Sequence, residues 1–200
     1  MNNSEIVVGI DLGTTNSEIY TYRNKQLEII PGPNQIRITP SRVFVDPAST
    51  QDSIKYLTGP KARAMQRRYP GNEIYEPKRL IGRTMDDQYV IQDLHYYPFK
   101  IVEGDNKTPL YSVQSSKAPE DITLSAIDVD AQILRTISNY RENIRKAVIT
   151  VPAYFKKEQI EATKQAGRQA GLEVLECIPE PVAAAIAYAM SHHVSNQTIV

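Results

Sequence analysis

The sequence predicts an α/β protein in which a mixed sheet with packed helices is interrupted by an inserted α+β subdomain. Residues 6–30 have the pattern of three short strands, and a continuous apolar, β-branched run occupies 147–151. From that run to residue 200, helix-like and strand-like segments alternate. Strands with short connections form an antiparallel meander, whereas strands that alternate with helices form parallel pairs. Together they predict one mixed sheet.

The N-terminal meander is predicted to contain strands at 6–11, 17–23 and 26–30. Asn24-Lys25 is the expected turn between the last two strands. A further strand is predicted in the second half of 37–45, after a stretch rich in proline.

The composition changes after this strand, because Pro, Ser, Thr, Asp and Gln cluster over 46–53. We therefore predict a discontinuous first subdomain made of 1–45 and 125–200, with 46–124 inserted into it. A chain of 200 residues is long enough to bury a core in one large domain or two small ones.

The remaining elements are predicted from caps, turn residues and apolar periodicity. Ser125 is expected to cap a helix, with Asp128 as its capping partner. The run 147–151, which Pro152 ends, is expected to be a central strand buried on both faces. The other expected elements are a helix from Pro60 to about Tyr69, an irregular stretch over 72–92, strands at 95–102 and 108–114, a helix from Ser125 to about 140–143, a helix at 157–171, a strand at 172–178, a turn at 179–181, a helix at 182–190 and a strand from Gln197.

Charge and cysteine content exclude several classes of protein. Lys+Arg and Asp+Glu both number 23, which argues against binding to nucleic acid or to a membrane surface. A single cysteine, Cys177, excludes an internal disulfide, fits a reducing compartment and is expected to be a buried, inert thiol. The sequence shows neither a signal peptide nor a membrane-spanning stretch, so we expect a cytoplasmic protein. The three histidines lack partners at zinc-ligand spacing.

The stretch Gly9–Asn16 is expected to be a tight turn between two strands, with an acid at its entrance and hydroxyls at its tip. Gly13 can adopt backbone angles closed to other residues, and the N–H groups of such a turn can bind an anion. Thr14 and Thr15 add donors. Asp11 cannot face a bare phosphate, so it indicates a metal ion shared with phosphates. The alternative is an ordinary hairpin with a polar turn.

Asp11, Pro152 and Glu180 all lie at the carboxyl ends of predicted strands. Ligands of α/β sheets bind beyond these ends, so the three residues predict a binding site there. Two of them also have a purely structural explanation: Glu180 begins a helix, where an acid suits the dipole, and Pro152 ends a strand.

Four blocks, in order, resemble the seventy-kilodalton heat-shock chaperones. They are Ile10-Asp11-Leu12-Gly13-Thr14-Thr15-Asn16-Ser17, Lys78-Arg79-Leu80-Ile81-Gly82-Arg83, Ile149-Thr150-Val151-Pro152-Ala153-Tyr154-Phe155, and Gly171-Leu172-Glu173-Val174-Leu175 with Glu180-Pro181 and Ala183-Ala184-Ala185. The resemblance implies the N-terminal lobe of the ATPase domain, with a ribonuclease H-like, actin-like ATPase fold. It implies that ATP hydrolysis drives binding and release of unfolded polypeptides. In that family a second ATPase lobe and a peptide-binding domain follow, so these 200 residues alone are expected to bind ATP weakly and to be inactive.

The resemblance also implies roles for individual residues. Asp11 and Glu180 would hold Mg²⁺ through water, and Glu180 would also position the attacking water. Lys78 would reach that water and the γ-phosphate, whereas its alternative role is that of a solvated charge among arginines. The phosphates of ATP or ADP would be held by Gly13, Thr14, Thr15 and Asn16, with Thr14 nearest the γ-phosphate. Pro152 would be an allosteric switch, and K⁺ is a further implied ion.

Implied partners are unfolded polypeptide clients, a J-domain co-chaperone and a nucleotide exchange factor, with no nucleic acid or membrane. The chain departs from the family pattern at Pro179 and Val182, which flank the Glu-Pro pair, and at Ile160 and Glu176, where the family carries basic residues. Two alternatives stay open: another ATPase of the actin and sugar-kinase superfamily, and a chaperone-like lobe that has lost its ATPase and binds proteins.

Overall fold

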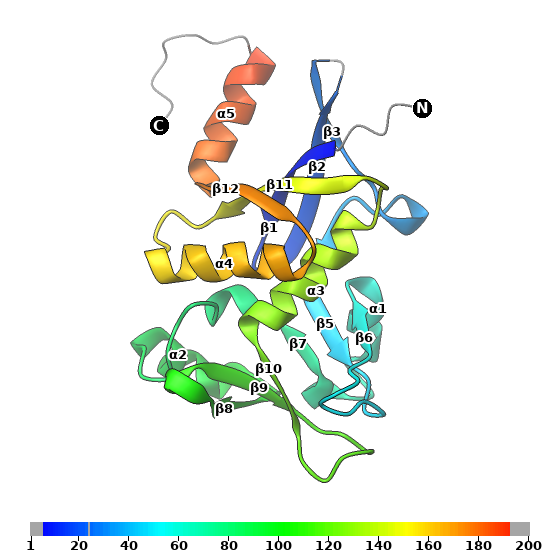
Figure 1. Ribbon diagram of the computed structural model, residues 1–200, viewed down its shortest axis with the longest axis vertical. Coiled ribbons are helices and arrows are strands. Elements are labelled where there is room, and N and C mark those ends of the chain that lie inside the picture. Colours follow the sequence, from blue (N-terminus) through cyan, green and yellow to red (C-terminus); the bar gives the residue numbers. More distant parts are fainter. Residues whose placement is uncertain (1–5, 24, 193–200) are drawn as a thin grey trace.

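The predicted mixed sheet is present in the computed structural model, which describes residues 6–23 and 25–192. Its strand order is β12-β11-β1-β2-β3, and a short β4 (Thr39–Pro40) pairs with β2 (Figure 1). Antiparallel pairs join β1 to β2 and β2 to β3, whereas β11 lies parallel to both β1 and β12. The strands are β1 (Ile6–Leu12), β2 (Asn16–Arg23), β3 (Gln26–Ile29), β11 (Ile144–Val151) and β12 (Glu173–Pro179).

Two helices, α3 (Ala126–Ser138) and α4 (Lys157–Gln169), cover one face of this sheet (Figure 1). In β1 the side chains of Val8, Ile10 and Leu12 point to that face and are buried, as the alternation of a strand requires. The third helix, α5 (Glu180–His192), contacts β11 and β12 and lies over the opposite face. Asp11 shares that opposite face, so it is turned away from the core.

The inserted segment forms two further three-stranded sheets, in the lower half of Figure 1. One has the order β6-β5-β7, with β5 (Arg42–Val45), β6 (Tyr56–Thr58) and β7 (Glu73–Tyr75). The other has the order β10-β9-β8, with β8 (Lys100–Glu103), β9 (Pro109–Val113) and β10 (Ile122–Ser125). The short helices are α1 (Pro60–Met65), α2 (Gln88–Asp93) and the 3₁₀ turns η1 (Pro33–Gln35), η2 (Pro70–Asn72), η3 (Pro77–Arg79), η4 (Leu94–Tyr96) and η5 (Asp105–Lys107).

Several expected elements differ from those observed. Helix α1 ends at Met65 rather than near Tyr69, and the stretch 72–92, expected to be irregular, contains β7, η3 and the start of α2. Strand β10 was not predicted at all, because its alternation of apolar and polar residues extends over only four residues and is a weak signal. Strand β5, placed in the first subdomain by the boundary at residue 45, pairs with strands of the insertion, so the change of sheet falls before Arg42.

The link between β12 and α5 also differs from the prediction, since 179–181 is not a turn. The strand continues to Pro179 and the helix begins at Glu180. The predicted turn at Asn24-Lys25 includes Asn24, which lies outside the described residues, as does the strand expected from Gln197.

The expected capping box of α3 is confirmed. Ser125 accepts a hydrogen bond from the backbone N–H of Asp128, and the carboxylate of Asp128 accepts one from the N–H of Ser125 at 2.9 Å. Strand β11 is central as expected, but only the face toward α3 and α4 is fully buried: Ala147, Ile149 and Val151 are buried, whereas Val148 and Thr150 are half-buried beside α5.

Cys177 is half-buried, and burial raises the pKa of its thiol to about 11, so it is a weak nucleophile at neutral pH. Within the part of the chain that the structure describes, none of the helices combines the length and the apolar character that crossing a membrane requires.

Candidate functional site

The turn between β1 and β2 is held by a residue that the sequence analysis missed. The hydroxyl of Ser41 donates a hydrogen bond to the carbonyl of Gly13 at 2.7 Å and lies 2.9 Å from the hydroxyl of Ser17. The N–H of Ser41 also donates to the carbonyl of Thr15. These bonds fix the backbone of the predicted phosphate loop before any ligand binds.

Gly13 is required in this turn for a reason other than the one predicted. It does not adopt a positive φ; the glycines that do are Gly59, Gly82 and Gly171. Instead, a Cβ added to Gly13 would lie 2.1 Å from the carbonyl oxygen of Asn16. The tight return of the chain thus leaves no room for a side chain.

Asp11 lies at the carboxyl end of β1 with its side chain exposed on the α5 side of the sheet. One of its oxygens, Oδ1, accepts a hydrogen bond from the hydroxyl of Thr150 in β11 at 2.8 Å. Thr150 was not predicted, although a single polar residue in the apolar run 147–151 was a visible signal. This bond orients the carboxylate and leaves its other oxygen available.

Lys78 reaches this edge of the sheet from the inserted segment. Its side chain is 4% exposed, and its Nζ donates to the main-chain carbonyl of Leu12 and, at 2.7 Å, to the carboxylate of Glu180. The ring of Phe155 lies 6.0 Å from the same nitrogen. The alternative prediction, a solvated charge among arginines, would leave Lys78 exposed. Lys78 is instead buried at the end of β1, 66 residues away in sequence from Leu12.

Glu180 is the first residue of α5, and its side chain is 44% exposed. Together with Asp11 and Thr150 it lines a hollow of about 500 Å³ between the open face of the sheet and α5. The carboxyl groups of Asp11 and Glu180 thus face one space, and Lys78 is hydrogen-bonded to its rim through Glu180.

Lys78 itself lines a neighbouring hollow of about 530 Å³, on the side of the inserted segment. Thr14 also lines it, with the basic residues Arg79, Arg83 and Lys156. Glu180 and Lys78 therefore connect two hollows, and neither hollow is lined by Asp11, Lys78 and Glu180 together.

The other predicted residues lie close to these groups but outside both hollows. Thr15 faces Ser41 through its carbonyl, and Asn16 pairs with Pro40 of β4. Pro152 is buried at the end of β11, and its carbonyl accepts a hydrogen bond from the N–H of Phe155. This bond closes the turn into α4 and connects the predicted switch proline to the residue that faces Lys78.

The oxygen ligands present fit an ion that keeps much of its water. Mg²⁺ is usually held by one or two carboxylates together with waters and phosphate oxygens, and Asp11 and Glu180 offer two carboxylates around one hollow. Over residues 6–23 and 25–192 there is no cluster of three or more His, Cys, Asp or Glu side chains able to hold a metal alone. The residues thus fit a magnesium ion bound with phosphates and do not form a closed protein cage.

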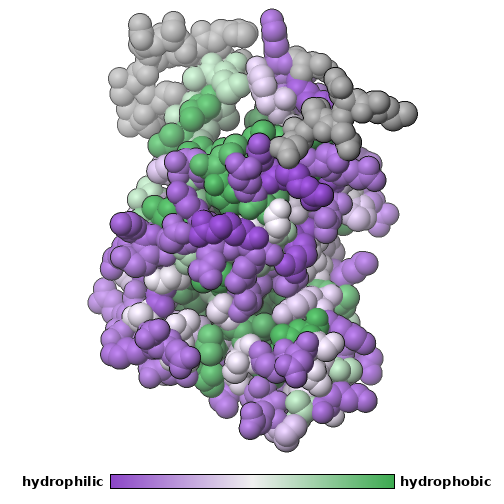
Figure 2. Space-filling model, viewed as in Figure 1, coloured by the Kyte–Doolittle hydropathy of each residue, from purple (hydrophilic) through white to green (hydrophobic). Residues whose placement is uncertain are grey.

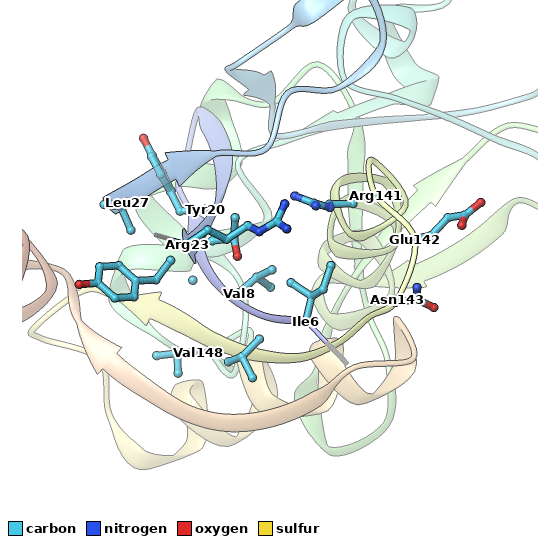
Figure 3. A pocket seen from close by; sticks show the side chains of 13 residues that line it. Ile6, Val8, Tyr20, Arg23, Leu27, Arg141, Glu142, Asn143 and Val148 are labelled. Atoms are coloured by element: carbon cyan, nitrogen blue, oxygen red, sulfur yellow. The ribbon is translucent and has the colours of Figure 1, made fainter. Parts of the chain in front are cut away.

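Tyr20 lines both this site and a larger hollow that adjoins it. Burial, a hydrogen bond to Glu18 and the negative charges of Glu18 and Asp11 raise the pKa of Tyr20 to about 12, so the phenol stays neutral. The larger hollow, of about 910 Å³, is lined by β1, β2 and the loop before β11. Figure 3 shows the side chains of Arg23 and Arg141 pointing toward one another above Val8 and Ile6. None of the predicted site residues lines it.

A family model described as Hsp70 protein matches residues 7–200. The match includes the turn after β1, the lysine of η3 and the glutamate that begins α5. Because it extends over nearly the whole sequence, it confirms the resemblance drawn from the four blocks. The chain therefore belongs to the Hsp70 family.

Proposed function

We propose that this chain is the first lobe of an Hsp70-type ATPase, in which ATP hydrolysis drives the binding and release of unfolded polypeptides. Hsp70 proteins are chaperones that bind ATP, so the family supports the general activity. The observation that carries the proposal is the buried Lys78, which is bonded to Leu12 and Glu180 at the strand end where Asp11 also lies.

Phosphoryl transfer requires charge neutralisation and positioning more than covalent chemistry. Lys78 is desolvated and positively charged, so it can stabilise negative charge on a terminal phosphate more strongly than an exposed lysine. Thr14 and the backbone of the Ser41-braced turn are the proposed phosphate contacts. Mg²⁺, held by Asp11 and Glu180, would supply further neutralisation of the phosphates.

The role of Glu180 follows from its bond to Lys78. In the present arrangement this bond keeps the glutamate at the mouth of the hollow, where it can accept a proton or a hydrogen bond from water.

The remaining residues have proposed roles in binding and signalling. We propose that Gly13, Thr15 and Asn16 contact the phosphates, and that Pro152 transmits the nucleotide state through Phe155. Clients, a J-domain co-chaperone and an exchange factor are the proposed partners, in the cytoplasm.

The proposal is tested by Lys78→Ala in the intact protein, with ATP turnover measured as phosphate release. Removing one preorganised electrostatic group typically lowers the rate by about 100-fold or more, which is the expected loss. Lys61→Ala, which removes an exposed lysine of α1, is the matched control and is expected to keep wild-type turnover.

Unchanged turnover in Lys78→Ala would contradict lysine-assisted hydrolysis. If the wild-type protein neither binds nor hydrolyses ATP, this result favours the alternative function, a lobe that binds proteins without ATPase activity. The exposed apolar side chains of α5, among them Val182 and Ile186, are the observation that favours it.

A further inference from the structure

Asp130 is a buried carboxyl group that the proposed chemistry leaves unused. It lies in the second turn of α3, its residue is 2% exposed, and its Oδ2 has no hydrogen-bond partner among the described residues. A buried carboxyl is normally paired, because an uncompensated charge in the interior is costly. Its position therefore requires an explanation.

Lys78 supplies the charge that acts on this carboxyl group. Helix α3 packs against η3, which carries Lys78. Burial raises the pKa of Asp130 to about 7, and the positive charge of Lys78 opposes that rise. Two carboxyl groups thus act on one lysine: Glu180 by direct contact at the mouth of the site, and Asp130 from within the protein.

The other elements around α3 offer Asp130 little compensation. From β9, the fully buried Tyr111 offers no charge: burial and the negative charge of Asp130 raise the pKa of its phenol, and its hydroxyl also lacks a partner in the described part of the chain. Tyr56 of β6 faces Asp128, and Arg42 of β5 pairs with Glu73. Strands β2 and β10 turn uncharged side chains toward α3, and the ion pairs of α4 lie on its exposed side.

We propose that Asp130 is a positioning residue for Lys78, a buried counter-charge that takes up a proton when a phosphate group binds against Lys78. The reason is electrostatic. While Lys78 is paired only with the half-exposed Glu180, its positive charge still favours the ionised form of the Asp130 carboxylate. Once a bound phosphate adds negative charge beside Lys78, the buried carboxylate loses that stabilisation and binds a proton. The identity of the anion as a nucleotide phosphate rests on the proposed function, whereas the coupling of Asp130 to Lys78 does not.

The first experiment is calorimetric titration of the intact protein with Mg²⁺ and a non-hydrolysable ATP analogue. It is carried out near pH 7 in two buffers of different ionisation enthalpy. Because Asp130 is about half ionised near pH 7, the difference between the binding heats of the wild type in the two buffers should correspond to uptake of up to about half a proton. Asp130→Asn should bind with a heat that no longer depends on the buffer. Asp52→Asn, the same change at an exposed loop carboxyl, should behave as the wild type.

Buffer-independent heat in the wild type, or undiminished proton uptake in Asp130→Asn, would overturn the proposal. If no variant binds nucleotide, the proposed function fails, and a second experiment still decides the coupling. In this second experiment, infrared spectra of the protein are recorded as a function of pH, and the spectra of the Asp130→Asn variant are subtracted. The difference isolates the carboxyl absorption of Asp130 and gives the pH at which it titrates.

In this second experiment, replacing Lys78 by Met should move the titration of Asp130 upward by about one pH unit or more, since the opposing charge is lost. Lys78→Arg keeps the charge and should leave the titration near its original pH. Equal midpoints in the Lys78→Met and wild-type backgrounds would disprove the coupling. Circular dichroism establishes that each variant is folded.

Discussion

Lys78 is the residue on which the candidate site depends, because it joins the inserted segment to the end of β1 and to the start of α5. Its Nζ contacts the carbonyl of Leu12 and the carboxylate of Glu180, and its side chain is almost fully buried. A buried lysine with a single carboxylate contact is sensitive to every charge near it. Asp130 is such a charge, and its burial makes the free energy of unfolding depend on pH even without a ligand.

Asp130→Asn is predicted to change how stability depends on pH. The pKa of Asp130 rises from 3.8 to about 7 on folding, so between these values the unfolded chain binds fewer protons than the folded one. The free energy of unfolding therefore falls as pH rises through this window. Removing the carboxyl group should abolish up to about 4 kcal/mol of that fall.

The measurement is urea unfolding of the wild type, Asp130→Asn and Asp52→Asn from pH 4 to pH 8. The informative quantity is how the free energy of unfolding changes with pH in each protein. Its absolute value is less useful, because burying an asparagine lowers stability by an amount that does not depend on pH. The Asp52 control should follow the wild type. Parallel curves for the wild type and Asp130→Asn would show that Asp130 is ionised throughout.

At the scale of elements, α4 is positioned by its small residues. The sequence places Ala162, Ala166 and Gly167 along the predicted helix, and all three are buried in α4. A Cβ added to Gly167 would lie 2.3 Å from Cγ2 of Val174 in β12. The close approach of helix and sheet places Phe155, just before α4, beside Lys78.

Gly167→Ala is accordingly predicted to destabilise the protein although alanine is the better helix former by about 1 kcal/mol. Overpacking at this contact should lower the free energy of unfolding by about 1 to 3 kcal/mol, as measured by urea unfolding. Gln165→Ala, at an exposed position of the same helix, should change it by less than about 0.5 kcal/mol. A gain in stability for Gly167→Ala would mean that α4 moves away from β12 without cost.

For the whole molecule, the uneven cover of the main sheet is the dominant feature. Helices α3 and α4 bury one face, whereas α5 covers only part of the other. Figure 2 shows hydrophobic residues gathered over α5 and the adjacent part of the sheet. Several of them are about half exposed: Val182, Ile186, Tyr188 and Met190. These side chains form a group on one helix, whereas exposed apolar side chains on most protein surfaces are scattered singly.

This patch is predicted to bind an apolar fluorescent dye. Ile186 lines the hollow beside Asp11 and is 49% exposed, so Ile186→Ser should lower dye fluorescence at least about twofold. Its cost in stability should be below about 1.5 kcal/mol, since much of the side chain is already in water. Tyr96→Ser, at a side chain of η4 that is 81% exposed, is the control outside α5. Equal loss of signal in both variants would show that the dye does not bind at α5.

The sequence by itself determined the order and type of the main elements, because apolar periodicity, the Ser125 capping box and the small residues of α4 are local signals. It also indicated Asp11, Thr14, Lys78 and Glu180 through family blocks. Only the tertiary structure decided that Ser41 braces the turn, that Thr150 orients Asp11 and that the charge of Lys78 acts on the buried Asp130. These interactions join residues 28, 139 and 52 positions apart (130 − 78 = 52 for the last), and no local pattern encodes burial or pairing over such separations.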